Sequence, residues 1–414
     1  MIAAIGFVAL VGAAGFRATP GALVDPLQRQ FGWSTGIIGF AMSVNLALYG
    51  VTAPFASALM ERFGVRRVTA GAMTLIALGS GLTVFMTASW QLVLLWGVLV
   101  GLGAGSISLG FVATIGTRWF VKRQGLVTGL LSAGGSTGSL IFLPLVARLS
   151  EAPGGWKTAA VVVSLVALAT VPMILLFFRE YPADLGIPPY GAEEIEPVPP
   201  RTGNAARLAV NGLKTAARTK TFWLLSIAFA ICGASTNGLV NTHFIPAAHD
   251  HGMPTVTAAG LLALIGVFDL IGTILSGWLS DRIDSRILLA VYYSLRGISL
   301  LVLPHLFNRQ VTGFMLVFIV FYGMDFIATV PPTVALCREH FGVSAPIVFG
   351  WIFAAHQIGA AFAATLAGIT RDDFGTYAPA WYVAGALSVG AALLSMATRR
   401  PAAVEAPIEE PVLV

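Results

Sequence analysis

Apolar stretches of about 20 residues recur along the whole chain, and each is long enough to cross a bilayer as a helix. The sequence predicts twelve such helices, at 3–27, 35–58, 67–88, 91–117, 125–148, 156–178, 222–247, 255–279, 286–306, 311–336, 346–369 and 376–397. Only 10% of the residues are charged, whereas about a quarter are charged in a soluble domain. We therefore expect an all-α membrane protein embedded in a lipid bilayer.

The longest polar stretch, 179–221, separates six predicted helices from six others. It is rich in proline, and its end, at about 204–220, is expected to form an amphipathic helix on the membrane surface. The predicted organisation is an N-terminal six-helix half at 1–178, a cytoplasmic linker at 179–221, a C-terminal half at 222–400 and a cytoplasmic tail at 401–414.

Lysine and arginine residues orient the predicted bundle, because cytoplasmic loops carry an excess of them. In this topology 17 of the 24 lysines and arginines lie on the side of the linker and both termini. Both termini are therefore expected to be cytoplasmic. The net charge of +5 follows from this placement and indicates no nucleic-acid partner.

The two halves repeat each other in sequence. Adding 220 to a residue number places Pro26 on Pro246 and Arg62 on Arg282, and the offset becomes 221 later in the half. A constant offset through five helices predicts two parallel, pseudo-symmetric halves. Transporters built in this way bind substrate between the halves near the midplane and rock to alternate access.

Polar residues break the repeat at three pairs of positions: Arg17 with Asn237, Tyr49 with Asp269, and Gly105 with Asp325. Arg17 is the most informative, since a guanidinium deep in a bilayer is costly and cannot be deprotonated. Its natural partner is a carboxylate of the protein or of a ligand. Arg17 therefore either binds an anionic substrate or ties the first helix to a neighbour.

Two loops resemble known signatures of the major facilitator superfamily. The stretch from Ser57 to Arg67 resembles its loop motif between helices 2 and 3. The stretch from Gly277 to Arg286 resembles the second copy of that motif, between helices 8 and 9. The resemblance implies that these loops form a cytoplasmic gate. Its charged residues would be Glu61, Arg62, Asp281 and Arg282.

A narrower resemblance is to the monocarboxylate-porter branch and its bacterial relatives. It rests on the stretch from Arg17 to Leu27 and on the stretch from Trp119 to Gly129. In animal members an aspartate in helix 8 is followed four residues later by an arginine, whereas here Asp269 is followed by Thr273. Arg17 could therefore take the role of the substrate-binding arginine.

Further candidates come from polar residues within the apolar spans. The expected substrate-binding residues are Arg17, Asn45, Tyr49, Asn237, Asn241, His356 and Gln357, although each of them could instead be a packing residue. Asp269 and Asp325 are candidates for proton coupling. Arg296 is expected to form a structural ion pair with one of these two carboxylates.

The resemblance implies a secondary active transporter of a small organic anion, expected to be a monocarboxylate, by proton symport. It also implies a functional monomer in a bacterial inner membrane. The alternative is proton-driven export of drugs or other amphipathic compounds. An enzyme is not expected, because the sequence has no nucleotide-binding loop, metal-ligand cluster or nucleophile triad, and we expect no cofactor and no metal.

Overall fold

The computed structural model describes residues 1–33, 35–150, 154–195, 198 and 204–398; for some helical residues, Arg17 among them, it describes only the backbone. Ten apolar helical segments of this part of the chain are long enough to cross a membrane. One of them, Gly313–Arg371, contains two crossings, and the apolar part of the first helix, Ile2–Gly15, adds one more. The prediction of twelve membrane helices in an all-α fold is thus confirmed.

In the first half, the crossings are formed by α1 (Ile2–Phe31), α2 (Thr35–Phe63), α3 (Val65–Leu82), the continuous run α4 (Ser89–Leu92), η2 (Val93–Val100), α5 (Gly101–Ser106) and α6 (Leu109–Trp119), then α7 (Gln124–Ser150) and α8 (Gly155–Phe177). The fourth crossing is interrupted between α5 and α6, where Ile107 leaves the helical conformation.

In the second half, the crossings are formed by α10 (Lys220–Gly233) with η4 (Ala234–Val240) and α11 (Asn241–Asp250), then α12 (Thr255–Ser280), α13 (Ser285–Val302), α14 (Gly313–Asp325) with α15 (Val330–Phe341), α16 (Ala345–Phe374) and α17 (Ala378–Ala397). The segment η4 is π-helical, so its backbone hydrogen bonds join residues five apart and not four. The break between α14 and α15 lies at the same place in the repeat as the break in the first half.

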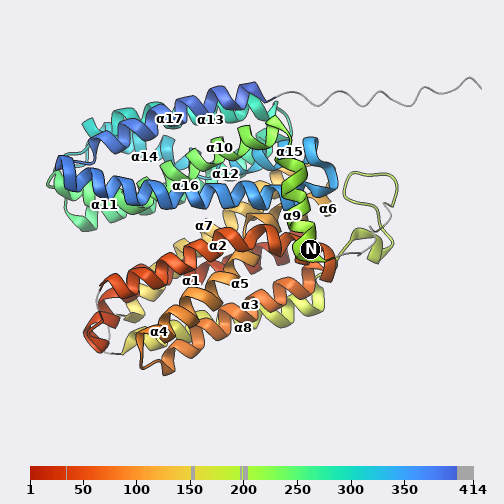
Figure 1. The fold of residues 1–414 in the computed structure, drawn as a ribbon, viewed down its shortest axis with the longest axis horizontal. Coiled ribbons are helices and arrows are strands. Elements are labelled where there is room, and N and C mark those ends of the chain that lie inside the picture. Colours follow the sequence, from red (N-terminus) through yellow and green to blue (C-terminus); the bar gives the residue numbers. More distant parts are fainter. Residues whose placement is uncertain (34, 151–153, 196–197, 199–203, 399–414) are drawn as a thin grey trace, which may run out of the picture.

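Each half is a separate bundle (Figure 1). Within the first half α1 packs on α7 and α3 packs on α8, while in the second half α10 packs on α16 and α13 packs on α17. These pairs are related by the repeat, so the same plan of helix contacts is built twice.

The halves meet chiefly through two symmetry-related contacts, α7 with α12 and α2 with α16. Small residues allow the backbones to approach, as is usual between membrane helices. A Cβ atom on Gly125 would collide with the backbone of Gly277, and one on Gly350 would collide with Pro54. The linker helix α9 (Ala205–Ala216) lies at one end of the molecule, which we call the linker end (Figure 1). The contact of Gly350 with Pro54 lies close to it, because Ile347 and Ala58, one turn away, pack on Ala209 of α9.

The helix α9 bridges the two halves at the linker end. Ala209 of α9 packs with Ala58 of α2 and Ile347 of α16 in one small buried cluster. The indole of Trp351 donates a hydrogen bond of 3.0 Å to the carbonyl of Ala209. The predicted amphipathic helix therefore forms, and its apolar face packs on both halves. At the opposite end, which we call the loop end, the helices of the two bundles diverge (Figure 1).

Candidate functional site

A cavity of about 390 Å³ lies between the two halves. The first-half wall is largely apolar, with Leu10, Ala13 and Ala14 of α1. Its polar side chains are Tyr49, Ser108 and a row of serines on α7. The second-half wall holds most of the larger polar side chains: Asn237, Asn241, Asp269, His356 and Gln357. The cavity therefore offers most of its hydrogen-bonding groups on the second-half side and a largely apolar surface on the first-half side.

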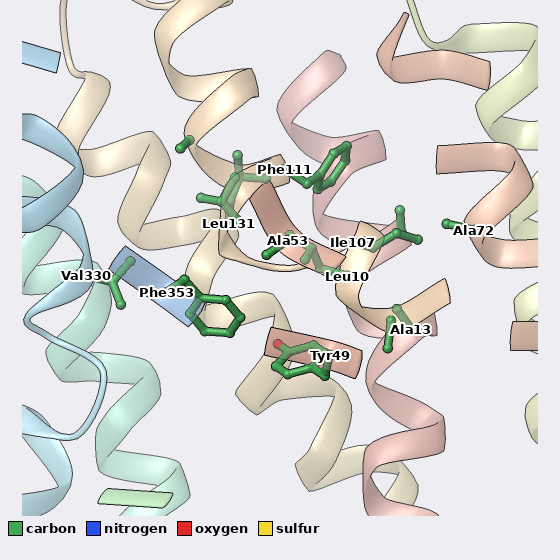
Figure 2. Packing of buried hydrophobic residues seen from close by; sticks show 14 of the residues in the cluster. Leu10, Ala13, Tyr49, Ala53, Ala72, Ile107, Phe111, Leu131, Val330 and Phe353 are labelled. Atoms are coloured by element: carbon green, nitrogen blue, oxygen red, sulfur yellow. The ribbon is translucent and has the colours of Figure 1, made fainter. Parts of the chain in front are cut away.

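Tight contacts between the halves close the cavity toward the linker end. Gly50 of α2 lies against the side chain of Gln357 of α16, and Gly129 of α7 lies against the backbone of Thr273 of α12. The ring of Tyr49 meets the ring of Phe353 edge to face, with 5.3 Å between their centroids. Figure 2 shows these two aromatic side chains approaching each other from the two halves.

Asp269 of α12 is a buried carboxylate at the wall of this cavity. One oxygen, Oδ1, accepts hydrogen bonds of 2.9 Å from the hydroxyl of Thr273 and from the backbone N–H of Ile327. The other oxygen, Oδ2, accepts a hydrogen bond from the hydroxyl of Ser136 on α7, which belongs to the first half. Asp269 thus joins both halves and also the break between α14 and α15.

Arg296 of α13 donates hydrogen bonds to the backbone carbonyls that the same break leaves free. Its Nε lies 2.6 Å from Oδ2 of Asp325, and its Nη2 donates to the backbone carbonyls of Asp325 at 2.5 Å and Phe326 at 3.2 Å. Its Nη1 donates to the sulfur of Cys232 at 2.8 Å. Backbone groups that a helix break leaves without intrahelical bonds must find other partners in a membrane. Here Arg296 bonds to the carbonyls of Asp325 and Phe326, and Asp269 bonds to the N–H of Ile327.

His356 of α16 belongs to a second polar group on the cavity wall. Its Nδ1 lies 3.1 Å from the carbonyl of Phe229, and its Nε2 lies 3.3 Å from the amide nitrogen of Asn237. The amide of Asn241 donates in turn to Oδ1 of Asn237 at 3.0 Å. Asn237 lies on the π-helical segment η4, and such segments are frequent at functional sites.

The four residues expected to form a gate lie at the linker end, but they make unlike contacts. Asp281 follows α12 and accepts hydrogen bonds from the backbone N–H groups of Gly125 at 2.7 Å and Leu126 at 3.0 Å, at the start of α7 in the other half. Glu61 instead pairs with Arg118 of its own half at 2.7 Å. Of these two acidic residues, Asp281 is the one seen to link the halves.

The basic residues of the two loop motifs rest on aromatic rings. The guanidinium of Arg282 lies 3.9 Å from the ring centre of Trp278, and that of Arg62 lies 5.2 Å from the ring centre of Phe63. Arg282 also donates a hydrogen bond of 3.0 Å to the carbonyl of Trp278.

Most of the candidate binding residues line the cavity: Tyr49, Asn237, Asn241, His356, Gln357 and the carboxylate Asp269. Asn45 lies elsewhere, since it packs against the fourth crossing and donates a hydrogen bond of 2.8 Å to the carbonyl of Trp96. Asp325 and Arg296 are buried behind the cavity wall. The side chain of Arg17 lies outside the described residues.

Two residues with important contacts were not among the candidates. Ser136 carries the hydrogen bond from the first half to Asp269, and Cys232 lies between Arg296 and the cavity. The sequence offered little signal for either. A serine in a membrane helix usually bonds to its own backbone, and a lone cysteine is usually a packing residue.

Two parallel bundles around a central cavity define a class of membrane transporters. The model of the Major Facilitator Superfamily matches residues 5–345, and the chain belongs to that family. It is a transporter and not an enzyme.

Relatives cover most of the chain at low identity. The uncharacterized MFS-type transporter YcxA of Bacillus subtilis (strain 168) is 25% identical over 375 residues, which cover 88% of this chain and 86% of the relative. Monocarboxylate transporter 13 of Rattus norvegicus is 28% identical over 395 residues, covering 89% and 85%. The solved structure of the proton:xylose symporter XylE matches with a TM-score of 0.72 and 17% identity, covering 96% and 95%, which is a likeness of fold alone.

Proposed function

We propose that this protein transports a small organic monocarboxylate together with a proton, by alternating access of its two halves. The observation that carries the proposal is Asp269, a buried carboxylate at the cavity wall that accepts hydrogen bonds from both halves. A proton on such a group changes both the charge of the cavity and the contact between the halves. The resemblance to monocarboxylate transporters supports the choice of substrate class.

An organic acid fits the unequal walls of the cavity. The amides and the imidazole of the second half can meet a carboxylate, while the apolar residues of α1 can cover a hydrocarbon tail. Arg17 is the proposed positive partner. It follows Ala13 and Ala14 of the cavity wall by four and three residues, so helical spacing puts position 17 on the same face of α1.

Asp269 is a better candidate for the proton site than Asp325. The carboxylate of Asp325 pairs with Arg296 at 2.6 Å, and protonating it would leave a buried guanidinium without a counter-charge. Protonating Asp269 removes a negative charge from an acceptor of three hydrogen bonds, and hydrogen bonds to a charged acceptor are the stronger ones. The contact with Ser136 would then weaken, which favours opening at the linker end.

The charge distribution supports a topology for this proposal. With the linker end in the cytoplasm, the described conformation is closed toward the cytoplasm, and the cavity belongs to an outward-facing state. The proposed domains are the halves at 1–178 and 222–400, the linker at 179–221 and the tail at 401–414. We also propose that the protein works as a monomer in a bacterial inner membrane.

Uptake by the purified protein in liposomes tests the proposal. We expect an inward proton gradient to drive uptake of at least one acid from a panel of labelled short-chain, branched and aromatic monocarboxylates. Arg17→Ala and Arg17→Lys should each reduce this uptake by at least about tenfold, because neither keeps the bidentate fit to a carboxylate. Unchanged uptake by both variants would remove the argument for an anionic substrate.

The apolar wall of the cavity also suits the alternative, export of amphipathic compounds in exchange for protons. The same liposomes distinguish the two functions. An exporter would move an amphipathic cation such as ethidium against a proton gradient and would leave the labelled acids outside. That result would replace the monocarboxylate proposal.

A further inference from the structure

The hydrogen bonds around His356 run in a single direction. A carbonyl can only accept, so the contact with Phe229 fixes the hydrogen of the neutral imidazole on Nδ1. The other nitrogen, Nε2, is then an acceptor and faces the amide nitrogen of Asn237. Oδ1 of Asn237 is left to accept from Asn241. We call these three side chains, Asn241, Asn237 and His356, the amide relay.

All three side chains of the relay line the cavity, and the relay runs along its wall from an exposed to a buried position. Asn241 is exposed and lines the cavity, whereas His356 is 7% exposed. With one N–H engaged by Asn237, the Asn241 amide has its oxygen and its second N–H left for the cavity. An anion beside this amide meets the lone pairs of its oxygen and can accept from one N–H only, so the relay in this form holds an anion poorly.

We propose that protonation of His356 reverses the amide relay, so that its cavity end, which presents an oxygen and one N–H, comes to present both N–H groups to a carboxylate. A proton on Nε2 makes that nitrogen a donor, so the amide of Asn237 must turn its oxygen toward the ring. The nitrogen of Asn237 then faces Asn241, which must turn its own oxygen inward. The nitrogen of Asn241 is released toward the cavity. Every bond of the relay is retained with its direction reversed.

This inference rests on the proposed function and deepens it, because it explains how a proton and an anion can favour each other's binding. The proton adds a positive charge near the cavity and also replaces the oxygen of Asn241 at its surface with a second N–H donor. By linkage, an anion bound at Asn241 must favour protonation of His356 by the same factor. Asp269 would control the contact between the halves, while the amide relay would set the affinity for the anion.

The surroundings hold the imidazole in one orientation. Its ring stacks on Phe353 with 5.8 Å between centroids and lies 4.8 Å from the ring of Phe229. Gly233 brings α10 against α16, because any Cβ at that position would collide with the carbonyl of His356. The ring is thus confined, and the two amides are the groups that can turn.

Among the side chains that the structure describes, few charged groups face the relay from the helices packed around it. Cys232 of α10 lies within reach of the imidazole, and behind it lies the ion pair of Arg296 with Asp325, whose charges offset each other. From α2, Tyr49 reaches the ring of Phe353 beside His356, and from α12, Asp269 lines the same cavity. An anion held at Asn241 would add the negative charge that favours a protonated imidazole.

Nitrogen NMR of the full-length protein with ¹⁵N-labelled histidine tests the relay. The signal of His356 is assigned by its loss in His356→Gln. At high pH we expect the tautomer with hydrogen on Nδ1, and on acidification a second hydrogen on Nε2. Asn237→Asp, which can only accept, should keep His356 protonated to a pH about one unit higher than in the natural protein. A neutral ring with hydrogen on Nε2, or no effect of Asn237→Asp, would overturn the relay.

Benzoate then serves as the probe anion, with chloride at equal concentration as the control. Benzoate should raise the pH at which His356 is half protonated, and its own binding should tighten by at most about tenfold per pH unit on acidification. Asn241→Leu should remove the effect of benzoate, while His243→Gln should retain it, because His243 bonds to the carbonyl of Ala364 outside the relay. No response to benzoate in the natural protein would overturn the link between the relay and anions.

The outcome for the relay can be separated from that for transport. If uptake of the labelled acids is driven by protons but His356 carries its hydrogen on Nε2 when neutral, the relay is wrong and the proposed function stands. If no labelled acid is transported while the His356 signal and Asn237→Asp behave as expected, the proposed function fails and the reversal of the relay stands.

Discussion

Where the second half buries Arg296, the first half buries Ile76, 220 positions earlier, and both side chains are fully inaccessible to solvent. The partners differ as well. Gly105 of the first half corresponds to Asp325, and Tyr49 corresponds to Asp269. In the first half Ile76 packs beside Gly103 of the fourth crossing, while in the second half Arg296 and Asp325 form an ion pair.

Both halves interrupt the same crossing, between α5 and α6 in the first and between α14 and α15 in the second. Among the described residues, no buried ion pair stands at the break of the first half, where Ile76 and Gly105 take the places of Arg296 and Asp325. In the second half the break is held by Arg296 and Asp269, and Asp269 also lines the cavity. The comparison teaches that the fold is built symmetrically, whereas the buried carboxylates of the described part of the chain, Asp269 and Asp325, both lie in the second half.

Removing one member of the buried ion pair should have the largest effect on stability. Asp325→Ala leaves the guanidinium of Arg296 without a counter-charge and should cost about 3 to 5 kcal/mol of folding stability. Thermal unfolding in detergent and the yield of folded protein would measure the loss. A stable Asp325→Ala protein would show that the pair is not needed for folding.

A double variant that copies the first half, Arg296→Ile with Asp325→Gly, provides the matched control. It removes both charges together, and we expect it to be more stable than Asp325→Ala, because no buried charge is left unpaired. If the double variant is less stable than Asp325→Ala, the second half depends on more than the charge balance of this pair.

The second-largest effect is expected from a substitution that disturbs the close contact between the two halves. Gly277→Ala places a methyl group against the backbone of Gly125 and should disfavour the described conformation by about 1 to 3 kcal/mol. Gly260→Ala, in the same helix α12 but with open space around it, is the control and should leave the conformation unchanged. Distances between spin labels on the two halves at the linker end would report the shift. Equal distances in the two variants would contradict this account of the interface.

The two acidic residues of the loop motifs should differ in what they control. Asp281→Asn weakens hydrogen bonds to the start of α7 in the other half and should favour opening at the linker end by about 1 to 2 kcal/mol. Glu61→Gln removes an ion pair with Arg118 inside the first half and should leave the opening equilibrium nearly unchanged. The same spin-label distances test both, and a larger shift for Glu61→Gln would reverse the assignment.

An exposed ion pair in the second half should have the smallest effect. Arg371 of α16 pairs with Asp250 of α11 at 2.6 Å, but their side chains are 38% and 27% exposed. Arg371→Ala should therefore change the free energy of unfolding by less than about 1 kcal/mol. A loss as large as that of Asp325→Ala would show that burial does not explain the difference between the two pairs.

The sequence predicted the features that the bilayer imposes. The number of crossings follows from the apolar stretches, and the symmetry of the halves follows from the constant offset. Tyr49, Asn237, Asn241 and His356 could be chosen as cavity residues because polar groups in apolar helices tend to face a protein interior.

The contacts inside the site were harder to predict. Arg296 could reach either of two carboxylates by sequence alone, and only its place in space shows that it pairs with Asp325. Asn45 is polar within an apolar helix like the others, yet it bonds to the carbonyl of Trp96 outside the cavity. The bond from Ser136 to Asp269 crosses between the halves, and no local pattern marks which serine of α7 makes it.

The central claim is that Asp269 carries the proton that drives transport. The most direct test compares Asp269→Asn with the natural protein in liposomes, using the labelled acid that the natural protein transports best. The account predicts that uptake driven by a proton gradient falls by at least about tenfold, because asparagine cannot bind or release the proton, while exchange of the acid at equal pH is retained. A normal dependence of uptake on pH in Asp269→Asn would contradict the claim.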